Sequence, residues 1–335
     1  MNAFIVSIGL MILASVIQGS WSLAIKKSAP YSWEAFWALF SVLGMILLPY
    51  LWARMVIPDV MTFLLDSSKE SILVPFIFGM LWGIGAIAFG LAIVKIGMSL
   101  TYGINMGIGA AVGALVPFFL LPDIPPGTML LVTSATVIII LGIVVNTRAG
   151  LNRERIQEQD KGLRSGNMKS GLILAVIAGL STAAFNIGFN SCMPLIHRIE
   201  KSGISIQNAS MVAWLLVLSG GFLANFLYAM FLLLKNNTYR DYVKSGSMRS
   251  MLATILAAAG FFAAIALYGQ AAAMMGNMGP VVGWILFNSI ALIVSNLWGI
   301  RTGEWTGAEK ELRRLFLGNS ILIIAWILLA ISNVL

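Results

Sequence analysis

The chain has 335 residues, of which 59% are hydrophobic and only 10% are charged, with a mean hydropathy of +0.92. A soluble domain carries roughly a quarter of its residues as charges, so this composition excludes a water-exposed globular surface and indicates a protein whose solvent is lipid. The net charge of +8 does not indicate nucleic-acid binding, because the basic residues are confined to short loops.

Apolar runs, taken in chain order, predict ten transmembrane helices. A helix needs about 20 mostly apolar residues to cross a bilayer. Lysines follow the first run instead of preceding it, and the run is too long for a signal peptide, so we expect it to stay as a membrane helix. The predicted spans are 3–23, 33–57, 72–94, 98–121, 128–147, 169–190, 208–234, 250–273, 278–299 and 313–334.

The basic residues predict the orientation of these spans. With ten spans, both termini lie on one side of the membrane. The loops after odd-numbered spans hold 17 of the 21 Lys and Arg residues. The other side carries Arg54, Lys69, Arg198 and Lys201. Because cytoplasmic loops are enriched in Lys and Arg, we expect both termini to be extracytoplasmic.

A polar segment divides the ten spans into five and five. A duplicated unit of five helices would insert the second time upside down, and such inverted repeats are typical of secondary transporters. A shift of 179 residues places Gly90 on Gly269 and Gly97 on Gly276, at the junction of the third and fourth helices of each half. The predicted division is a first five-helix repeat at 1–147, a cytoplasmic linker at 148–168 and a second five-helix repeat at 169–335.

Glycines recur four residues apart in the third and fourth spans. Gly79 and Gly83 form one such pair, and Gly103 and Gly107 another. This spacing aligns glycines on one helix face and allows close approach of backbones. Static packing and the sliding of helices during transport both remain open as explanations.

Side-chain amides inside the spans point to a polar cavity. They are costly in lipid unless they are paired or line a wet cavity. Several stand beside aromatic residues at helical spacing, as Asn288 does with Trp284. An amide offers donors and an acceptor for sugar hydroxyls, and an aromatic ring can cover the apolar face of a pyranose. The pattern, with almost no buried charge, favours a neutral polyhydroxyl solute, although interhelical hydrogen bonding remains the alternative for any single amide.

Glu34 is the one acidic residue inside an apolar span, in the first turn of the second predicted helix between Trp33 and Trp37. A carboxylate at a helix N-terminus is stabilised by the helix dipole, and under this interpretation Lys26 or Lys27 is the candidate ion-pair partner. Partial desolvation could instead make it a proton carrier. The sequence leaves both roles open.

The sequence offers little support for an enzymatic reaction or a metal site. Cys192 is the only cysteine and His197 the only histidine, so no disulfide and no Cys/His metal site is expected. His197 is expected in a solvated loop outside the membrane. With so few acid–base candidates, we expect neither an enzyme nor a cofactor.

Four stretches of the sequence resemble the bacterial L-rhamnose–proton symporter family of the drug/metabolite transporter superfamily. They are KKSAPYSWEAFW (26–37), GMLWGIGAIAFGLAIVKIGMS (79–99), NTRAGLNRER (146–155) and GEWTGAEK (303–310). The resemblance implies an all-α fold of ten helices in two inverted five-helix repeats and proton-driven uptake of a 6-deoxy-hexose. It implies that Glu34 and Trp82 are functional residues. The chain departs from the family pattern at Ala86, Ala88 and Gln270, which leaves the identity of the sugar open.

These observations together predict a proton-coupled sugar importer in the bacterial inner membrane, with L-rhamnose or a related deoxy-hexose, protons and lipid as its partners. A drug or metabolite exporter and an uncoupled sugar facilitator on the same fold are the alternatives. Glu34 is predicted to carry the proton. The residues predicted to line a central cavity are Gln18, Trp82, Asn105, Tyr268, Gln270, Trp284 and Asn288.

Overall fold

The computed structural model describes residues 2–96, 98–121, 126–159 and 168–332, and in this part of the chain the secondary structure consists of helices joined by turns, without a strand. The predicted all-helical fold is therefore confirmed. The longer elements are α1 (Asn2–Gln18), α2 (Trp33–Ser41), α3 (Leu48–Val56), α5 (Lys69–Ile96), α6 (Met98–Phe119), α7 (Pro126–Gln159), α8 (Met168–Ser191), α9 (Met193–Glu200), α11 (Met211–Lys235), α12 (Ser247–Met274), α13 (Trp284–Arg301) and α14 (Glu309–Ser332).

Within the described residues, nine segments are long and apolar enough to cross a membrane. Each coincides with one of the first nine predicted spans. The tenth prediction, 313–334, falls on α14, and its last two residues lie outside the described part of the chain. Apolar side chains such as Val94 stand exposed on these helices, as expected where lipid covers them.

The structure corrects two local predictions, the end of the fifth helix and the position of His197. The fifth helix does not end at residue 147, because α7 continues to Gln159 through residues of good helix propensity such as Arg153 and Glu154. The first part of the predicted linker is thus helical, and residues 160–167 lie outside the described part. His197 does not lie in a loop but in the short helix α9, where it is half-buried.

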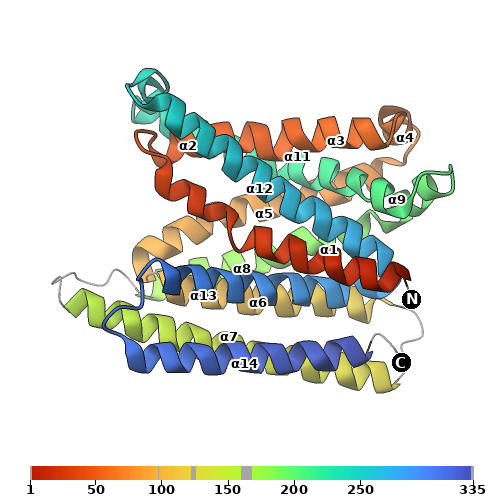
Figure 1. The fold of residues 1–335 in the computed structure, drawn as a ribbon. Helices are drawn as coiled ribbons and strands as arrows, with labels where there is room; N and C mark the ends of the chain where they lie inside the picture. Colours follow the sequence, from red (N-terminus) through yellow and green to blue (C-terminus); the bar gives the residue numbers. More distant parts are fainter. Residues whose placement is uncertain (1, 97, 122–125, 160–167, 333–335) are drawn as a thin grey trace.

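The long helices run roughly side by side, and the two chain ends lie at the same end of the molecule (Figure 1). In the central part α5 packs on α8 and α11, α12 packs on α1, and α6 packs on α8. The helices α7 and α14 pair along one edge. The helices of the two sequence halves are therefore interleaved.

Three spans are locally irregular near the centre of the bundle. The first span breaks after α1 at Gly19 and Ser20 and continues as the 3-10 helix η1 (Trp21–Lys27). The π-helix η2 (Val42–Leu47) joins α2 to α3, and the π-helix η5 (Gly279–Gly283) leads into α13. Irregular backbone inside a membrane protein is tolerated where it is buried or lines a cavity. A ligand-binding site is therefore expected near these breaks.

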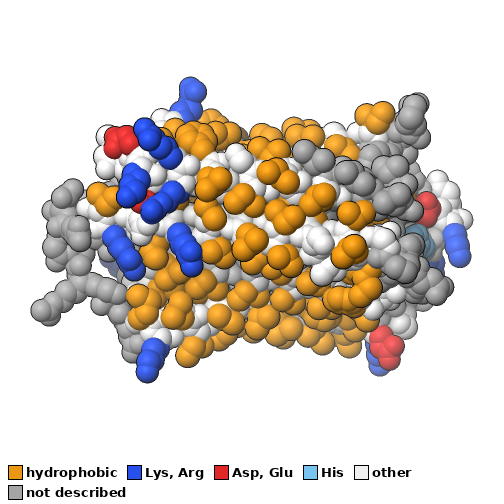
Figure 2. Space-filling view, turned by 90° about the horizontal axis from the view of Figure 1, so that it is seen from below, with side chains coloured by type: hydrophobic (Ala, Val, Ile, Leu, Met, Phe, Trp, Pro, Cys, Tyr) orange, Lys and Arg blue, Asp and Glu red, His pale blue; other side chains and the backbone are white. Residues whose placement is uncertain are grey.

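Charge is distributed unevenly along the molecule. Figure 2 shows an apolar band around the middle, with Lys and Arg side chains gathered mainly at one end. We call this end, at which α7 ends and α12 and α14 begin, the basic end. It is opposite the end at which the termini lie (Figure 1).

Candidate binding cavity

A cavity of about 230 Å³ lies among the central helices, and we call it the central cavity. The break after α1 opens onto it through Gln18, Gly19 and Ser22. Five of the seven residues predicted to line a cavity are brought together here from four different spans. They are Gln18, Trp82, Asn105, Trp284 and Asn288.

The amides of the central cavity have hydrogen-bonding capacity left over. The hydroxyl of Thr182 on α8 donates to Asn105 Oδ1 at 2.9 Å, which leaves the Asn105 Nδ2 group as a donor. Asn288 Nδ2 donates to the carbonyl of Trp284 at 2.8 Å, which leaves Asn288 Oδ1 as an acceptor. Gln18 Oε1 is buried and has no hydrogen-bond partner. A ligand bearing hydroxyl groups, each both donor and acceptor, could satisfy all three atoms.

Aromatic rings form much of the cavity wall. Trp21 stacks on Phe40 with ring centroids 5.3 Å apart, and Trp37 also stacks on Phe40, at 4.9 Å. Trp82 lies parallel to Phe261, with an interplanar angle of 6° at 6.1 Å. Aromatic faces of this kind bind the apolar surface of a ligand, and the ligand needs no charge for this contact. No lining residue of the central cavity is charged, within the described part of the chain.

Tyr268 and Gln270 line neither this cavity nor the second one described below. Tyr268 is fully buried, with its ring against Trp214 and Phe287. Its hydroxyl donates to Asn186 Oδ1. Gln270 is half-buried, two residues further along α12.

Asn186 explains why Tyr268 is held away from the cavity. Its Nδ2 donates to the carbonyls of Gly113 at 2.8 Å and Pro280 at 2.7 Å, while its Oδ1 receives the Tyr268 hydroxyl. The amide thus joins α8, α6, η5 and α12. Asn186 is therefore an interhelical hydrogen-bonding residue, the alternative that the sequence left open for each amide.

Glu34 lies in the first turn of α2, as predicted, and is only 8% exposed. Its Oε1 accepts hydrogen bonds from Asn236 Nδ2 at 2.9 Å and from Thr238 Oγ1 at 2.8 Å. Both donors come from the segment between α11 and α12, in the other half of the sequence. Glu34 does not line the central cavity, whereas Trp37, one turn further along α2, does.

A second acidic side chain holds the same region in place, and no feature of the sequence pointed to it. Asp241 is 2% exposed; its Oδ2 accepts from the backbone N–H of Ser32 at 2.8 Å, and its Oδ1 pairs with Lys244. Burial raises the pKa of Asp241, but the Lys244 ammonium and the Ser32 hydrogen bonds outweigh it and hold this pKa below its usual range. Asp241 thus anchors the start of α2 to the α11–α12 connection.

A second cavity of about 360 Å³ adjoins the first at the basic end, and we call it the basic-end cavity. Gly19, Ser22 and Tyr102 line both cavities. The basic-end cavity also contains Arg153 and Glu304, a charged pair that was not among the predicted site residues. The sequence offered a signal, because both residues stand in stretches that carry the family resemblance.

Comparison with known proteins identifies the family of the sequence. The sequence model of the L-rhamnose-proton symport protein family matches residues 1–333. The chain is 26% identical to the L-rhamnose-proton symporter of Klebsiella pneumoniae over 90% of each protein. It is 25% identical to the L-rhamnose-proton symporter of Yersinia pestis, over 97% of this chain and 96% of that protein. Because the match extends over nearly the whole sequence, the chain belongs to the L-rhamnose-proton symport protein family.

Proposed function

We propose that this chain imports L-rhamnose or a related deoxy-hexose together with protons, by alternating access across the bacterial inner membrane. The main support for the proposal is the chemistry of the central cavity, found in a chain that belongs to this family. Its lining combines unsatisfied amide atoms with aromatic faces and has no charged side chain among the described residues. This chemistry suits a neutral sugar and disfavours an anion or a lipophilic cation. Membership of a transport family also supports a transporter over an enzyme.

Gln18, Asn105 and Asn288 are the proposed hydrogen-bonding partners of the sugar, and Trp82 and Trp284 its proposed ring contacts. The five lie on both halves of the sequence, so a relative movement of the halves would change their spacing. Alternating access requires such a change at the site.

The proposed architecture is ten spans in two inverted repeats, 1–147 and 169–335, as in the drug/metabolite transporter superfamily. The helix contacts support it. If each helix is replaced by its equivalent in the other half, a helix pair that is in contact becomes another pair that is also in contact. The pairing of α5 with α8 becomes that of α12 with α1, and the pairing of α7 with α14 maps onto itself. The 179-residue shift also places Trp82 on Phe261, and these two rings stack on each other. Residues beside a two-fold axis contact their own equivalents.

Glu34 is the proposed proton carrier. It is the only acidic residue within the predicted spans, and its hydrogen bonds tie it to the opposite half of the sequence. A carboxylate that loses these donors when the halves move would change its proton affinity. An uncoupled sugar facilitator is the second candidate, favoured by the position of Glu34 outside the central cavity.

Sugar-evoked current from proteoliposomes on a solid support, at symmetrical pH, distinguishes these two functions. An inward positive current on adding L-rhamnose is expected, because a proton accompanies a neutral sugar. Tracer uptake without current would establish a facilitator. Neither current nor uptake with L-rhamnose or a panel of deoxy-hexoses, from folded protein, would refute sugar transport.

Replacing Glu34 by Gln then tests the proton carrier. Glutamine keeps an oxygen that can accept from Asn236 and Thr238, so the fold is expected to survive. We expect accumulation against a gradient to be abolished, while exchange of internal for external sugar continues. The exposed Glu200, changed to Gln, provides the control and is expected to accumulate sugar normally. Undiminished accumulation by the Glu34→Gln protein would exclude Glu34 as the carrier.

A further inference from the structure

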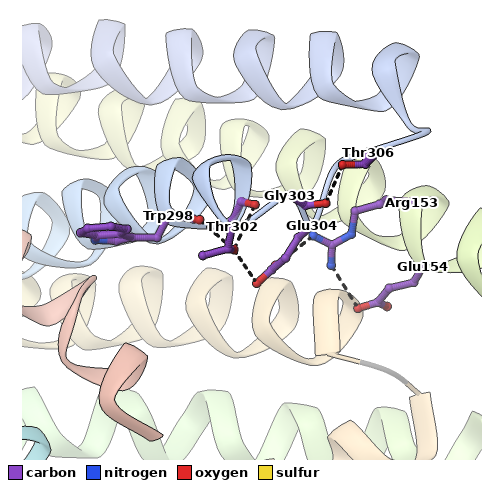
Figure 3. Close-up of polar contacts among 8 residues, drawn as sticks. Arg153, Glu154, Trp298, Thr302, Gly303, Glu304 and Thr306 are labelled. Carbon is purple, nitrogen blue, oxygen red and sulfur yellow. Dashed lines mark hydrogen bonds and ion pairs between the residues drawn. The ribbon is translucent and has the colours of Figure 1, made fainter. Parts of the chain in front are cut away.

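The basic-end cavity is larger than the central cavity, yet the proposed function does not use its most polar residues. Arg153, near the end of α7, reaches the connection between α13 and α14. Its Nη1 lies 3.4 Å from Glu304 Oε2 and its Nη2 lies 3.9 Å from Glu154 Oε1. Figure 3 shows the guanidinium between the two carboxylates, with Thr302 beside Glu304.

Two hydrogen-bond donors of this cavity are buried without an acceptor. Trp305 is 6% exposed, and its indole Nε1 has no partner; the same is true of Arg153 Nε. The guanidinium of Arg153 lies over the Trp305 ring, 4.8 Å from its centroid. Buried N–H groups in proteins are usually paired. Of the four buried side-chain N–H groups without an acceptor among the described residues, only those of Arg153 and Trp305 belong to residues that line a cavity, where a ligand could supply the acceptor.

Gly299 keeps the space beside these groups open. A β-carbon at this position would lie 3.2 Å from Glu304 Oε2 and 3.3 Å from Trp305 Nε1. The glycine backbone therefore borders the same space as the carboxylate and the indole N–H. A hydroxyl group can serve both, because it donates to a carboxylate and accepts from an N–H.

The charges of the cavity indicate the class of ligand. The lining carries one guanidinium, Arg153, and one carboxylate, Glu304, which pair with each other, so no charge is left over for an ionic ligand. Trp298 and Trp305 provide aromatic surface, and Asn146 and Asn296 provide amides. Donors, acceptors and aromatic faces without excess charge are the chemistry that recognises a neutral polyol.

We propose that the basic-end cavity is a second sugar-binding site, which holds the sugar between the central cavity and the basic end of the protein. The inference rests on the proposed function, because it takes the ligand of the central cavity as its own. The two cavities share Gly19, Ser22, Tyr102, Met106, Leu292 and Ser295 in their linings. A sugar leaving the central cavity toward the basic end therefore enters this site directly.

The test is the number of sugars bound per chain, measured by equilibrium dialysis of purified protein against saturating radiolabelled L-rhamnose. The wild-type protein is expected to bind two. Trp305→Phe removes the unpaired N–H but keeps the ring, and is expected to bind one. Arg153→Lys keeps the charge that faces Glu304 but removes Nε–H, and is also expected to bind one. At a sugar concentration that saturates the wild type but not the weakened central site, Asn288→Ala is expected to bind one.

Trp326→Phe is the matched control. Trp326 Nε1 is likewise without a partner, but the residue lines neither cavity, so two bound sugars are expected. One sugar per wild-type chain, lost in Asn288→Ala and retained in both Trp305→Phe and Arg153→Lys, would overturn the second site and leave the proposed function intact. No bound sugar in the folded wild-type protein would overturn the proposed function, and the second site with it.

Discussion

At the scale of single residues, the amides of the membrane spans have two different roles. Asn186 makes three interhelical hydrogen bonds and lines neither of the two cavities. Asn105 makes one hydrogen bond to α8 and Asn288 makes one within its own helix, and both keep atoms for a ligand. An amide whose partners are all in the fold contributes to stability, and one with spare atoms can contribute to binding.

Asn288→Ala is expected to weaken sugar binding without unfolding the protein. The loss of hydrogen bonds to the ligand costs about 1–3 kcal/mol, or roughly 5- to 150-fold in affinity. Equilibrium binding of L-rhamnose measures it. Asn190→Ala is the control, because Asn190 lies on α8 outside both cavities, and its affinity should match the wild type. Equal affinities for all three proteins would remove Asn288 from the site.

At the scale of elements, two kinds of contact hold the helices in place. Glycines allow α5 and α11 to approach closely: a β-carbon on Gly79 would lie 1.8 Å from the carbonyl oxygen of Val217. Hydrogen bonds to Asp241 and Glu34 fix the start of α2 against the α11–α12 connection. The first contact is within the membrane, and the second is at the basic end.

Gly79→Ala is expected to lower the thermal stability of the protein in detergent. Two backbones must separate to admit the methyl group, and overpacking of this kind costs about 1–3 kcal/mol or more. Gly90→Ala on the same helix is the control, since a β-carbon there would meet no atom within 4 Å. We expect Gly90→Ala to melt at or above the wild-type temperature. A Gly79→Ala protein that melts with the wild type would show that α5 and α11 tolerate separation.

Asp241→Asn is expected to destabilise the protein at neutral pH by roughly 1.5–3 kcal/mol, the worth of a hydrogen bond to a charged group. The pKa of Asp241 is lower in the folded protein than in the unfolded chain. The stabilisation that its carboxylate provides is therefore fully present above the unfolded pKa of about 3.9 and is lost as pH falls through the folded pKa. Melting curves from pH 7 downward should therefore show the wild type and Asp241→Asn converging in acid.

The exposed Asp59 provides the comparison for this experiment, since its side chain makes no capping hydrogen bond. Asp59→Asn should melt with the wild type at every pH. A constant gap between the wild type and Asp241→Asn across the pH range would mean that the ionised carboxylate is not the stabilising species.

At the scale of the whole molecule, the asymmetry of charge sets the expected orientation. The termini lie at one end and the basic residues gather at the other (Figures 1 and 2). Since Lys and Arg are retained on the cytoplasmic side during insertion, the basic end is expected in the cytoplasm. The basic-end cavity would then lie on the release side for an importer.

Reporter fusions test the orientation. Alkaline phosphatase, which is active only outside the cytoplasm, is expected to be active when fused after Leu335. The same reporter fused after Lys244, in the α11–α12 connection, is expected to be inactive. Green fluorescent protein at the two positions should give the opposite pattern. Phosphatase activity only at Lys244 would reverse the orientation and make the basic-end cavity an entry site.

The sequence by itself determined the helical class, the position of nine spans and the family, because lipid imposes the length and apolarity of every crossing helix and requires the backbone to bond to itself. It also identified five residues of the central cavity, since helical spacing places amides and aromatics on one face. Only the tertiary structure decided which amides have spare atoms. Asn186 and Tyr268 meet across 82 residues, and Arg153 and Glu304 across 151. Helical periodicity describes the face that a residue occupies, but the partner on the neighbouring helix depends on how the helices pack.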